Sequence, residues 1–231
     1  IVFFSTFAAM TRKERFDYIL QYFAQKEGHV TTELQFASAF QLLVATLLSA
    51  QCTDKRINQI TPELFRHYPT AKAMAAATWE DIFELIKSVS YPNAKAHHLS
   101  EMSRMLVEQF HGEVPDTREA LTSLPGVGRK TANVVQAVWF GKPTLAVDTH
   151  VFRVSHRLGL VPTTANTPLK VELALLKHIP TDQVSDAHHW ILLHGRYICK
   201  SQRPQCTTCP FNEFCPSSTI KKGTLPRATN G

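Results

Sequence analysis

Apolar residues recur along this chain with the period of an α-helix, and this feature most limits what it can fold into. Phe16, Ile19, Leu20, Phe23 and Ala24 follow the i, i+3, i+4, i+7, i+8 pattern of one helix face. No stretch offers several alternating strands in series. We therefore predict an all-α protein of about ten short helices, which are marginal alone and depend on tertiary packing.

Residues that favour helix ends bound the expected helices. The spacing predicts helices over 37–50, 117–123, 129–140, 149–158, 168–178 and 186–199. Thr53 and Thr78 are expected to start two more, and Pro62 is expected to kink or restart the first of these. Asn93 is expected to cap a long helix that Gly112 ends.

Composition excludes several protein classes. A hydrophobic fraction of 44% over 231 residues is typical of a globular protein with a substantial core, so wholesale disorder is excluded. The 25 Lys and Arg against 19 Asp and Glu give a net charge of +6, which hints at a polyanionic partner. Residues 34–53 carry no charge, but polar side chains interrupt them, so we expect a buried helix and no membrane partner. The apolar residues 1–9 lack a basic start and make a poor signal peptide.

The segment 124–133, Leu-Pro-Gly-Val-Gly-Arg-Lys-Thr-Ala-Asn, combines a very tight connection with a basic helix start. Gly126 and Gly128 permit positive φ and leave room for another backbone to approach. The first amides of the helix that follows, near Arg129, have no partners within the helix and can bind a phosphate oxygen. The alternative is a turn with only a structural role.

Lys130 stands in the first turn of that helix, where a cation is unfavourable. The same field favours the neutral amine that a lysine nucleophile needs, although a solvated or phosphate-binding lysine is the simpler reading of this residue alone. Downstream, Asp148 follows an apolar run and stands where an N-cap belongs. A carboxylate there can also stabilise a developing cation, so Lys130 and Asp148 form a candidate catalytic pair.

Four of the five cysteines crowd into one loop with the spacing Cys199-x6-Cys206-x2-Cys209-x5-Cys215. Four thiolates suit a structural zinc or an iron–sulfur cubane, and the wide outer spacing favours the bulkier cluster. Disulfides are a third possibility. They are disfavoured because we see no export signal and therefore expect a reducing cytoplasm. Lys200 and Arg203 lie between the first two cysteines, either as solvated charges or as a phosphate clamp. The remaining cysteine, Cys52, is expected in the core.

The hairpin, the lysine, the aspartate and the four-cysteine loop, in this order, resemble the helix-hairpin-helix DNA glycosylases, and among these the endonuclease III branch. The resemblance extends from about Met10 to Cys215. It implies two helical lobes that flank a DNA-binding cleft. One is a six-helix barrel with the hairpin, over 31–142, and the other is a lobe with a 4Fe–4S cluster, formed by 10–30 and 143–216. Residues 1–9 are then an upstream or non-native segment, and 217–231 a disordered tail.

The resemblance implies a bifunctional enzyme of base excision repair. The family everts a damaged base from duplex DNA into a pocket. The lysine matching Lys130 attacks the sugar C1′ and displaces the base, and the aspartate matching Asp148 assists. A Schiff base forms, and β-elimination nicks the strand. The expected substrates are oxidised pyrimidines and abasic sites in double-stranded DNA, and the expected oligomeric state is a monomer in the bacterial cytoplasm, at the nucleoid.

Further residues are assigned by the same resemblance. Gln51 matches the glutamine that enters the gap left by the everted base, with a helix-terminal polar residue as the alternative. Tyr91 occupies the position of the second wedge, commonly a leucine, and could stack on bases. His150 follows Asp148 closely and is expected to orient the site, or else to have a structural role.

Two competing functions remain open at this stage. An adenine glycosylase of the same fold usually lacks the hairpin lysine, which this chain has at position 130. A non-catalytic DNA-binding or redox protein with an iron–sulfur cluster would not need both Lys130 and Asp148.

Overall fold

The structure is a computed structural model, and it describes residues 10–220. Our expectation for residues 1–9 lies outside the described residues, as does that for the tail from 221 onward. The expected tail also included residues 217–220, which are described: the backbone N–H of Ser218 donates to the carbonyl of Cys215, and Thr219 hydrogen-bonds to Cys206.

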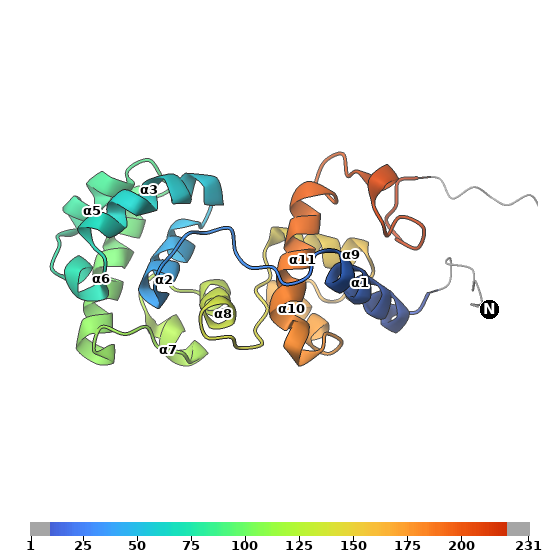
Figure 1. Cartoon of the computed structure of the whole chain (residues 1–231), viewed down its shortest axis with the longest axis horizontal. Helices are drawn as coiled ribbons and strands as arrows, with labels where there is room; N and C mark the ends of the chain where they lie inside the picture. Colours follow the sequence, from blue (N-terminus) through green and yellow to red (C-terminus); the bar gives the residue numbers. More distant parts are fainter. Residues whose placement is uncertain (1–9, 221–231) are drawn as a thin grey trace, which may run out of the picture. The chain divides into compact units, whose positions relative to one another are not determined.

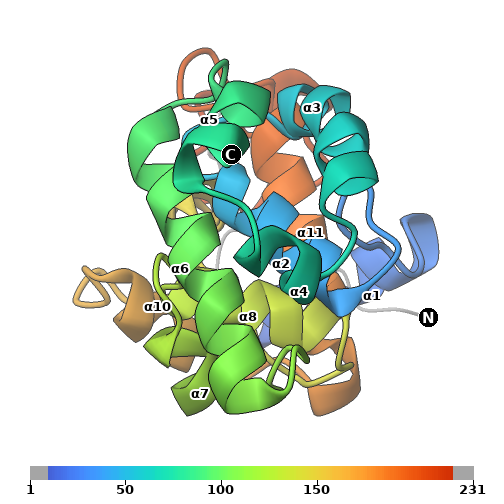
Figure 2. The same cartoon turned by 90° about the vertical axis from the view of Figure 1, so that its left-hand side faces the viewer.

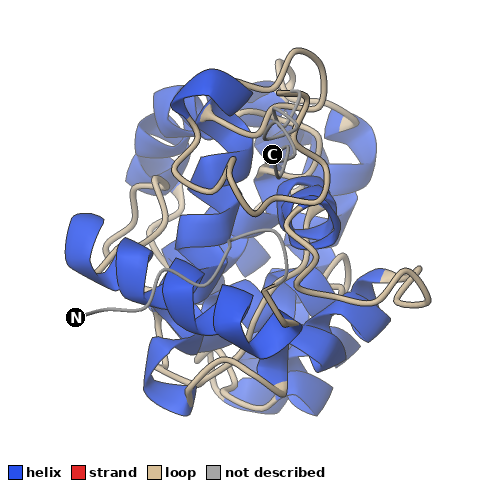
Figure 3. Cartoon of the chain, turned by 90° about the vertical axis from the view of Figure 1, so that its right-hand side faces the viewer, coloured by secondary structure: helices blue, strands red, loops and turns tan. Residues whose placement is uncertain are grey.

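The described residues are helical, and no strand occurs among them (Figure 3). The prediction of an all-α fold is confirmed. The α-helices are α1 (Arg12–Lys26), α2 (Ala39–Leu48), α3 (Asp54–His67), α4 (Ala71–Ala75), α5 (Trp79–Ile86), α6 (Pro92–Phe110), α7 (Arg118–Ser123), α8 (Arg129–Val138), α9 (Thr149–Arg157), α10 (Pro168–Leu176) and α11 (Val184–Tyr197). Two short 3₁₀ helices, η2 (Thr181–Gln183) and η3 (Cys206–Thr208), complete the described elements. None of these helices combines the length and the apolar character that crossing a membrane requires.

Most helices begin where the sequence offers a hydroxyl or carboxylate cap. Thr53 and Thr78 cap α3 and α5 as expected, each accepting a hydrogen bond from a backbone N–H of the first turn. The prediction that Pro62 restarts the helix was wrong, because α3 runs through Pro62. Ile57 and Leu64 of this helix are buried.

The expected start of α6 was also wrong. The helix begins at Pro92, with Tyr91 rather than Asn93 at the N-cap position. Proline suits the first helical position, because its fixed φ is already helical and its missing N–H would have no partner there. Tyr91 makes no side-chain cap, and its backbone lies in the left-handed region, with φ 55° and ψ 50°.

The chain divides into two compact units, which we call the central unit, Thr31–Ala146, and the terminal unit, which combines the described residues up to Val30 with those from Val147 onward. Both ends of the described chain therefore belong to the terminal unit (Figure 1). The central unit extends past 142, the end that we expected for the barrel. Residues 144 and 145 belong with it because their backbone and side-chain groups hydrogen-bond to α8.

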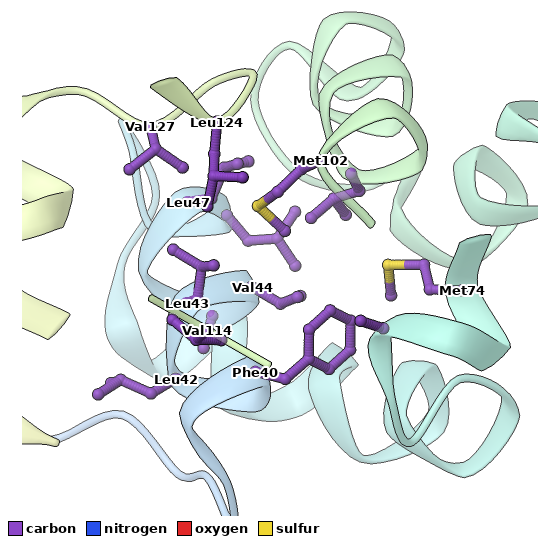
Figure 4. Close-up of a cluster of buried hydrophobic side chains, with 14 of the residues drawn as sticks. Phe40, Leu42, Leu43, Val44, Leu47, Met74, Met102, Val114, Leu124 and Val127 are labelled. Carbon is purple, nitrogen blue, oxygen red and sulfur yellow. The ribbon is translucent and has the colours of Figure 1, made fainter. Parts of the chain in front are cut away.

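The central unit is built around α2, whose side chains from Phe40 to Leu48 are nearly all buried. Helices α3, α6 and α8 contact α2, and α4 and α5 pack against α6 (Figure 2). Figure 4 shows the resulting hydrophobic core, in which side chains from α2 meet Met74 of α4 and Met102 of α6. This core fixes the loops that leave α2, α6 and α7.

The terminal unit has an aromatic core between α1, α11 and the cysteine loop. The ring of Phe23 stacks on Trp190 with centroids 6.0 Å apart and meets Phe211 edge-on at 5.3 Å. The indole N–H of Trp190 donates to the carbonyl of Gly28, at 2.9 Å. The N-terminal helix and the C-terminal segments are thus parts of one folded unit.

Candidate functional site

The hairpin between α7 and α8 requires glycine at one of its two positions. Gly126 has φ +76°, and a Cβ there would lie 2.9 Å from the side chain of His98 on α6. Of the two glycines that permit positive φ, only Gly126 adopts it. Gly128 has φ −89° and is the N-cap of α8, and nothing lies within 4 Å of a Cβ built there. Because Gly128 has no side chain, the space in front of the helix stays open.

Two apolar side chains anchor the hairpin in the core of the central unit. Leu124 and Val127 are 2% and 5% exposed, and Figure 4 shows them among the core side chains. The backbone N–H of Val127 donates to the carbonyl of Leu124, at 3.1 Å, which closes the turn. The hairpin is therefore a rigid support for whatever follows it.

Lys130 is an exposed residue in the first turn of α8, directly after this turn. The N-cap Gly128 has no side chain to satisfy the first amides of α8, which point outward at the end of the helix. The neighbouring Arg129 is partly buried. The start of α8 thus presents an accessible amine beside backbone donors suited to an anion.

A buried asparagine that the sequence did not single out holds α8 in place. Asn133 is 1% exposed; its Oδ1 accepts from the Nε of Arg118 at 3.1 Å, and its Nδ2 donates to the carbonyl of Leu145 at 2.9 Å. The hydroxyl of Thr144 donates to the backbone carbonyl of Asn133, at 2.7 Å. Asn133 therefore links α7, α8 and the segment that leads out of the central unit. Its place on the apolar face of a predicted helix is the signal that could have revealed it.

Asp148 is the N-cap of α9, in the terminal unit. Its Oδ1 accepts from the backbone N–H of Val151, at 2.7 Å, and the residue is partly buried. The predicted cap is confirmed. Lys130 belongs to the central unit and Asp148 to the terminal unit.

Arg153 fastens α9 to the end of α11. Its guanidinium donates to the carbonyls of Gly195, at 2.9 Å, and of Cys199, at 3.1 Å from both Nε and Nη2. The ring Nδ1 of His150 lies 3.2 Å from the same group. His150 therefore has a structural contact, two residues after Asp148, and the first cysteine of the loop is tied to the helix that Asp148 starts.

The two expected wedge residues lie at loop tips of the central unit. Gln51 and Tyr91 are exposed, and both have left-handed backbones, with φ 58° and 55°. Cys52 was expected in the core. It is instead partly buried at the end of the first loop, packed against the core and hydrogen-bonded to Ser90.

The four clustered cysteines line one pocket in the terminal unit, which is partly open to solvent. Arg157, His194 and Pro204 contribute to its walls, and no disulfide joins the four cysteines. Lys200 and Arg203 are exposed in the same loop, and Arg203 has a left-handed backbone with φ 50°. Among the described residues, no three His, Cys, Asp or Glu side chains form a group that could hold a single metal ion.

The protonation of the cysteine loop depends on its burial. Burial, together with the charges of the other three cysteines, raises the pKa of Cys209 to about 11. Burial lowers the pKa of His194 to about 4, so this ring is neutral at pH 7, and its Nε2 lies 3.7 Å from the sulfur of Cys209. The guanidinium of Arg157 lies 3.6 Å from the sulfur of Cys199. Four thiolates in this cavity would need a bound cationic group to offset their repulsion.

Comparisons with known proteins agree with these features. Residues 44–181 match the family of HhH-GPD superfamily base excision DNA repair proteins. Endonuclease III of Rickettsia conorii is 45% identical over 85% of this chain and 93% of its own length. Endonuclease III of Escherichia coli K12 is 44% identical over 89% of this chain and 96% of its own length.

A solved structure of a trapped endonuclease III–DNA covalent intermediate matches the fold with a TM-score of 0.86 and 42% identity, over 90% of this chain and 98% of that one. The family match over residues 44–181 includes the hairpin, Lys130 and Asp148. The chain belongs to the endonuclease III family, within the helix-hairpin-helix superfamily of base excision DNA repair enzymes.

Proposed function

We propose that this chain removes oxidised pyrimidines from duplex DNA and nicks the resulting abasic site, with Lys130 as the nucleophile and Asp148 as its supporting carboxylate. The observation that carries the proposal is the position of Lys130: an exposed amine in the first turn of α8, held by a turn that is anchored in the core. The chain is thus a DNA glycosylase with abasic-site lyase activity, and double-stranded DNA is its partner.

The reaction needs the unprotonated Nζ of Lys130. Its lone pair attacks C1′ of the everted nucleotide, and the base leaves with the electrons of the glycosidic bond. Loss of a proton from nitrogen and opening of the sugar give a Schiff base between Nζ and C1′. Removal of a proton from C2′ then expels the 3′ phosphate by β-elimination, and hydrolysis of the Schiff base frees the lysine. Each step uses the same amine.

Asp148 supports the first step through its charge. Its Oδ1 accepts a hydrogen bond from the N–H of Val151, at the N-terminal end of α9, which fixes the position of the carboxylate. An ionised carboxylate can stabilise positive charge that develops on the sugar as the base departs, or accept the proton of the attacking amine. Only one carboxylate oxygen, Oδ1, serves the cap, which leaves the other for this task.

DNA binding is assigned to both units. The backbone amides at Gly126, Gly128 and Arg129 would hold a phosphate at the start of α8, where no Cβ crowds them at position 128. Lys200 and Arg203 would contact the backbone from the cysteine loop. At the loop tips, Gln51 would fill the gap left by the everted base, and Tyr91 would stack into the opposite strand.

The cysteine cavity fits a 4Fe–4S cluster. Cys199, Cys206, Cys209 and Cys215 all line it, and a cationic iron core would offset the burial and the repulsion by the other cysteines that together raise the pKa of Cys209. A reducing cytoplasm keeps thiols from forming disulfides and so leaves them available for ligation of this kind. When bound, the cluster would tie the loop to α9 and α11, while base removal remains the work of Lys130 and Asp148.

The test is cleavage of matched duplexes that carry an oxidised pyrimidine, an abasic site or no damage, each with and without borohydride. We expect base release and nicking at the first two, a borohydride-dependent covalent adduct with each, and no reaction of the undamaged duplex. Base release without a nick or an adduct would contradict the lyase assignment. Binding without any reaction would favour a non-catalytic protein.

A further inference from the structure

The two loop tips of the central unit are both strained, and they are joined to each other. Left-handed backbones are uncommon for residues with a side chain, yet Gln51 and Tyr91 both adopt them. Such conformations persist only where the surrounding structure holds them, and they gather at functional sites. The contacts between the two loops therefore need an account.

A closed ring of hydrogen bonds connects the tips. The hydroxyl of Ser90 donates to the backbone carbonyl of Gln51, at 2.8 Å. The backbone N–H of Ser90 donates to the sulfur of Cys52 at 3.2 Å, and the thiol of Cys52 in turn lies 3.5 Å from the Ser90 hydroxyl. Each loop thus contributes the residue next to its tip.

A buried lysine locks the same two loops one layer deeper. Lys95 is 5% exposed, and its Nζ donates to the carbonyls of Leu48, at 2.8 Å, and Ala50, at 2.7 Å, at the end of α2. Its backbone N–H donates to the carbonyl of Tyr91, at 3.1 Å, in the first turn of α6. Burial lowers the pKa of Lys95. We call Ser90, Cys52 and Lys95 the loop clamp.

The sulfur in the clamp is held by polar contacts on several sides. Burial raises the pKa of the Cys52 thiol, but the hydroxyl and N–H of Ser90 and the charge of Lys95 outweigh this, so the pKa is lowered overall. Lys95 Nζ lies 3.9 Å from the sulfur. The clamp is therefore a connected polar network, in which the loss of one member affects the others.

We propose that Ser90 is a positioning residue for base eversion: through the loop clamp it holds Gln51 and Tyr91 in fixed register, so that both side chains enter the base stack together. The inference rests on the proposed function, because it needs the tips to act as wedges. Entry of two ordered side chains avoids the entropy cost of arranging two mobile loops at the moment of insertion. Ser90 acts through the two tips, and its removal should affect eversion and leave the covalent chemistry unchanged.

The experiment compares borohydride trapping at an abasic site in a duplex with trapping at the same site in a single strand. A single strand has no base pairs, so eversion leaves no gap in a duplex for the two side chains to fill. For Ser90→Ala we expect the duplex rate to fall about fivefold or more, because the hydroxyl loses its hydrogen bonds with the Gln51 carbonyl and the Cys52 thiol, with the single-strand rate unchanged. Cys52→Ala should lower the duplex rate in the same way, and Ser90→Thr should retain it. The matched control is Ser88→Ala, in the same loop, at an exposed serine.

A second measurement follows eversion itself. A fluorescent base opposite the abasic site should respond when the wild-type tips enter the stack, and the amplitude should fall for Ser90→Ala and persist for Ser88→Ala. An unchanged duplex rate in Ser90→Ala, or an equal fall on duplex and single strand, would overturn the proposal, the latter by showing a general structural role. Failure of the wild-type protein to form any adduct would instead overturn the proposed function, and this inference with it.

Discussion

At the scale of single residues, a change at Asp148 separates its cap from its catalytic role. Asparagine is as good an N-cap as aspartate, so Asp148→Asn should leave the stability of α9 almost unchanged. The loss of the charge should slow base release by about 100-fold or more, since electrostatic stabilisation of this kind contributes several kcal/mol. Single-turnover base release and thermal unfolding measure the two effects. Unimpaired turnover would reduce Asp148 to a cap.

The two hairpin glycines make a matched pair for a stability measurement. Gly126→Ala forces a side chain into a left-handed backbone and against His98, and should lower the free energy of unfolding by about 1–3 kcal/mol. Gly128→Ala meets open space at φ −89°, and should cost no more than about 1 kcal/mol, the penalty of alanine at an N-cap. Urea unfolding of the two variants decides this. Equal losses would contradict the distinct roles that the geometry gives them.

The sequence predicted these two residues unequally well. The Gly-x-Gly pattern indicated a tight turn, and the structure has this turn. The pattern does not show which of the two glycines needs a positive φ. That depends on His98, a neighbour 28 positions earlier in the chain (126 − 98 = 28), on another helix. The same limit hid the contact between Cys52 and Ser90, which are far apart in sequence.

At the scale of elements, α9 connects the candidate carboxylate to the cysteine loop through Arg153. The variant Arg153→Met keeps much of the stem but removes the donors to the carbonyls of Gly195 and Cys199. We expect a loss of about 2–4 kcal/mol in the stability of the terminal unit, because two partly buried carbonyls lose a charged partner. Hydrogen exchange of the end of α11 reports this directly. Arg12→Met, at an exposed residue at the start of α1, serves as the control.

Helix positions were largely predictable, because caps and apolar spacing are local signals. The starts of α3, α5 and α9 were fixed by Thr53, Thr78 and Asp148. The start of α6 was not, because Pro92 and Asn93 offer competing local preferences; the helix begins at Pro92, and the N–H of Lys95 donates to the carbonyl of Tyr91. Local sequence signals also did not predict that α3 would continue through Pro62.

At the scale of the whole molecule, the all-α fold followed from the sequence. The structure divides the chain into two units, and the terminal unit is formed by both ends of the described chain. The buried braces of the site did not follow. Asn133, Arg153 and Lys95 hold their elements by hydrogen bonds to backbone carbonyls of distant segments. Every residue has such a carbonyl, so the residue type does not show which one is the acceptor.

The cysteine loop gives a prediction for one whole unit. Cys209→Ala should abolish the broad absorption near ~400 nm that thiolate-bound iron clusters give, and should lower the hydrogen-exchange protection of the terminal unit more than that of the central unit. Cys52→Ala, outside the loop, should retain the absorption. A colourless wild-type protein that holds stoichiometric zinc would contradict the cluster and support the smaller metal site.

The most direct test of the central claim is to trap the protein on an abasic duplex with borohydride, digest the adduct and locate the modified residue by mass spectrometry. The account predicts a single sugar-derived mass addition on the peptide that contains Lys130, and no adduct with Lys130→Ala, while Lys142→Ala is trapped normally. An adduct on another lysine, or unchanged trapping of Lys130→Ala, would contradict it.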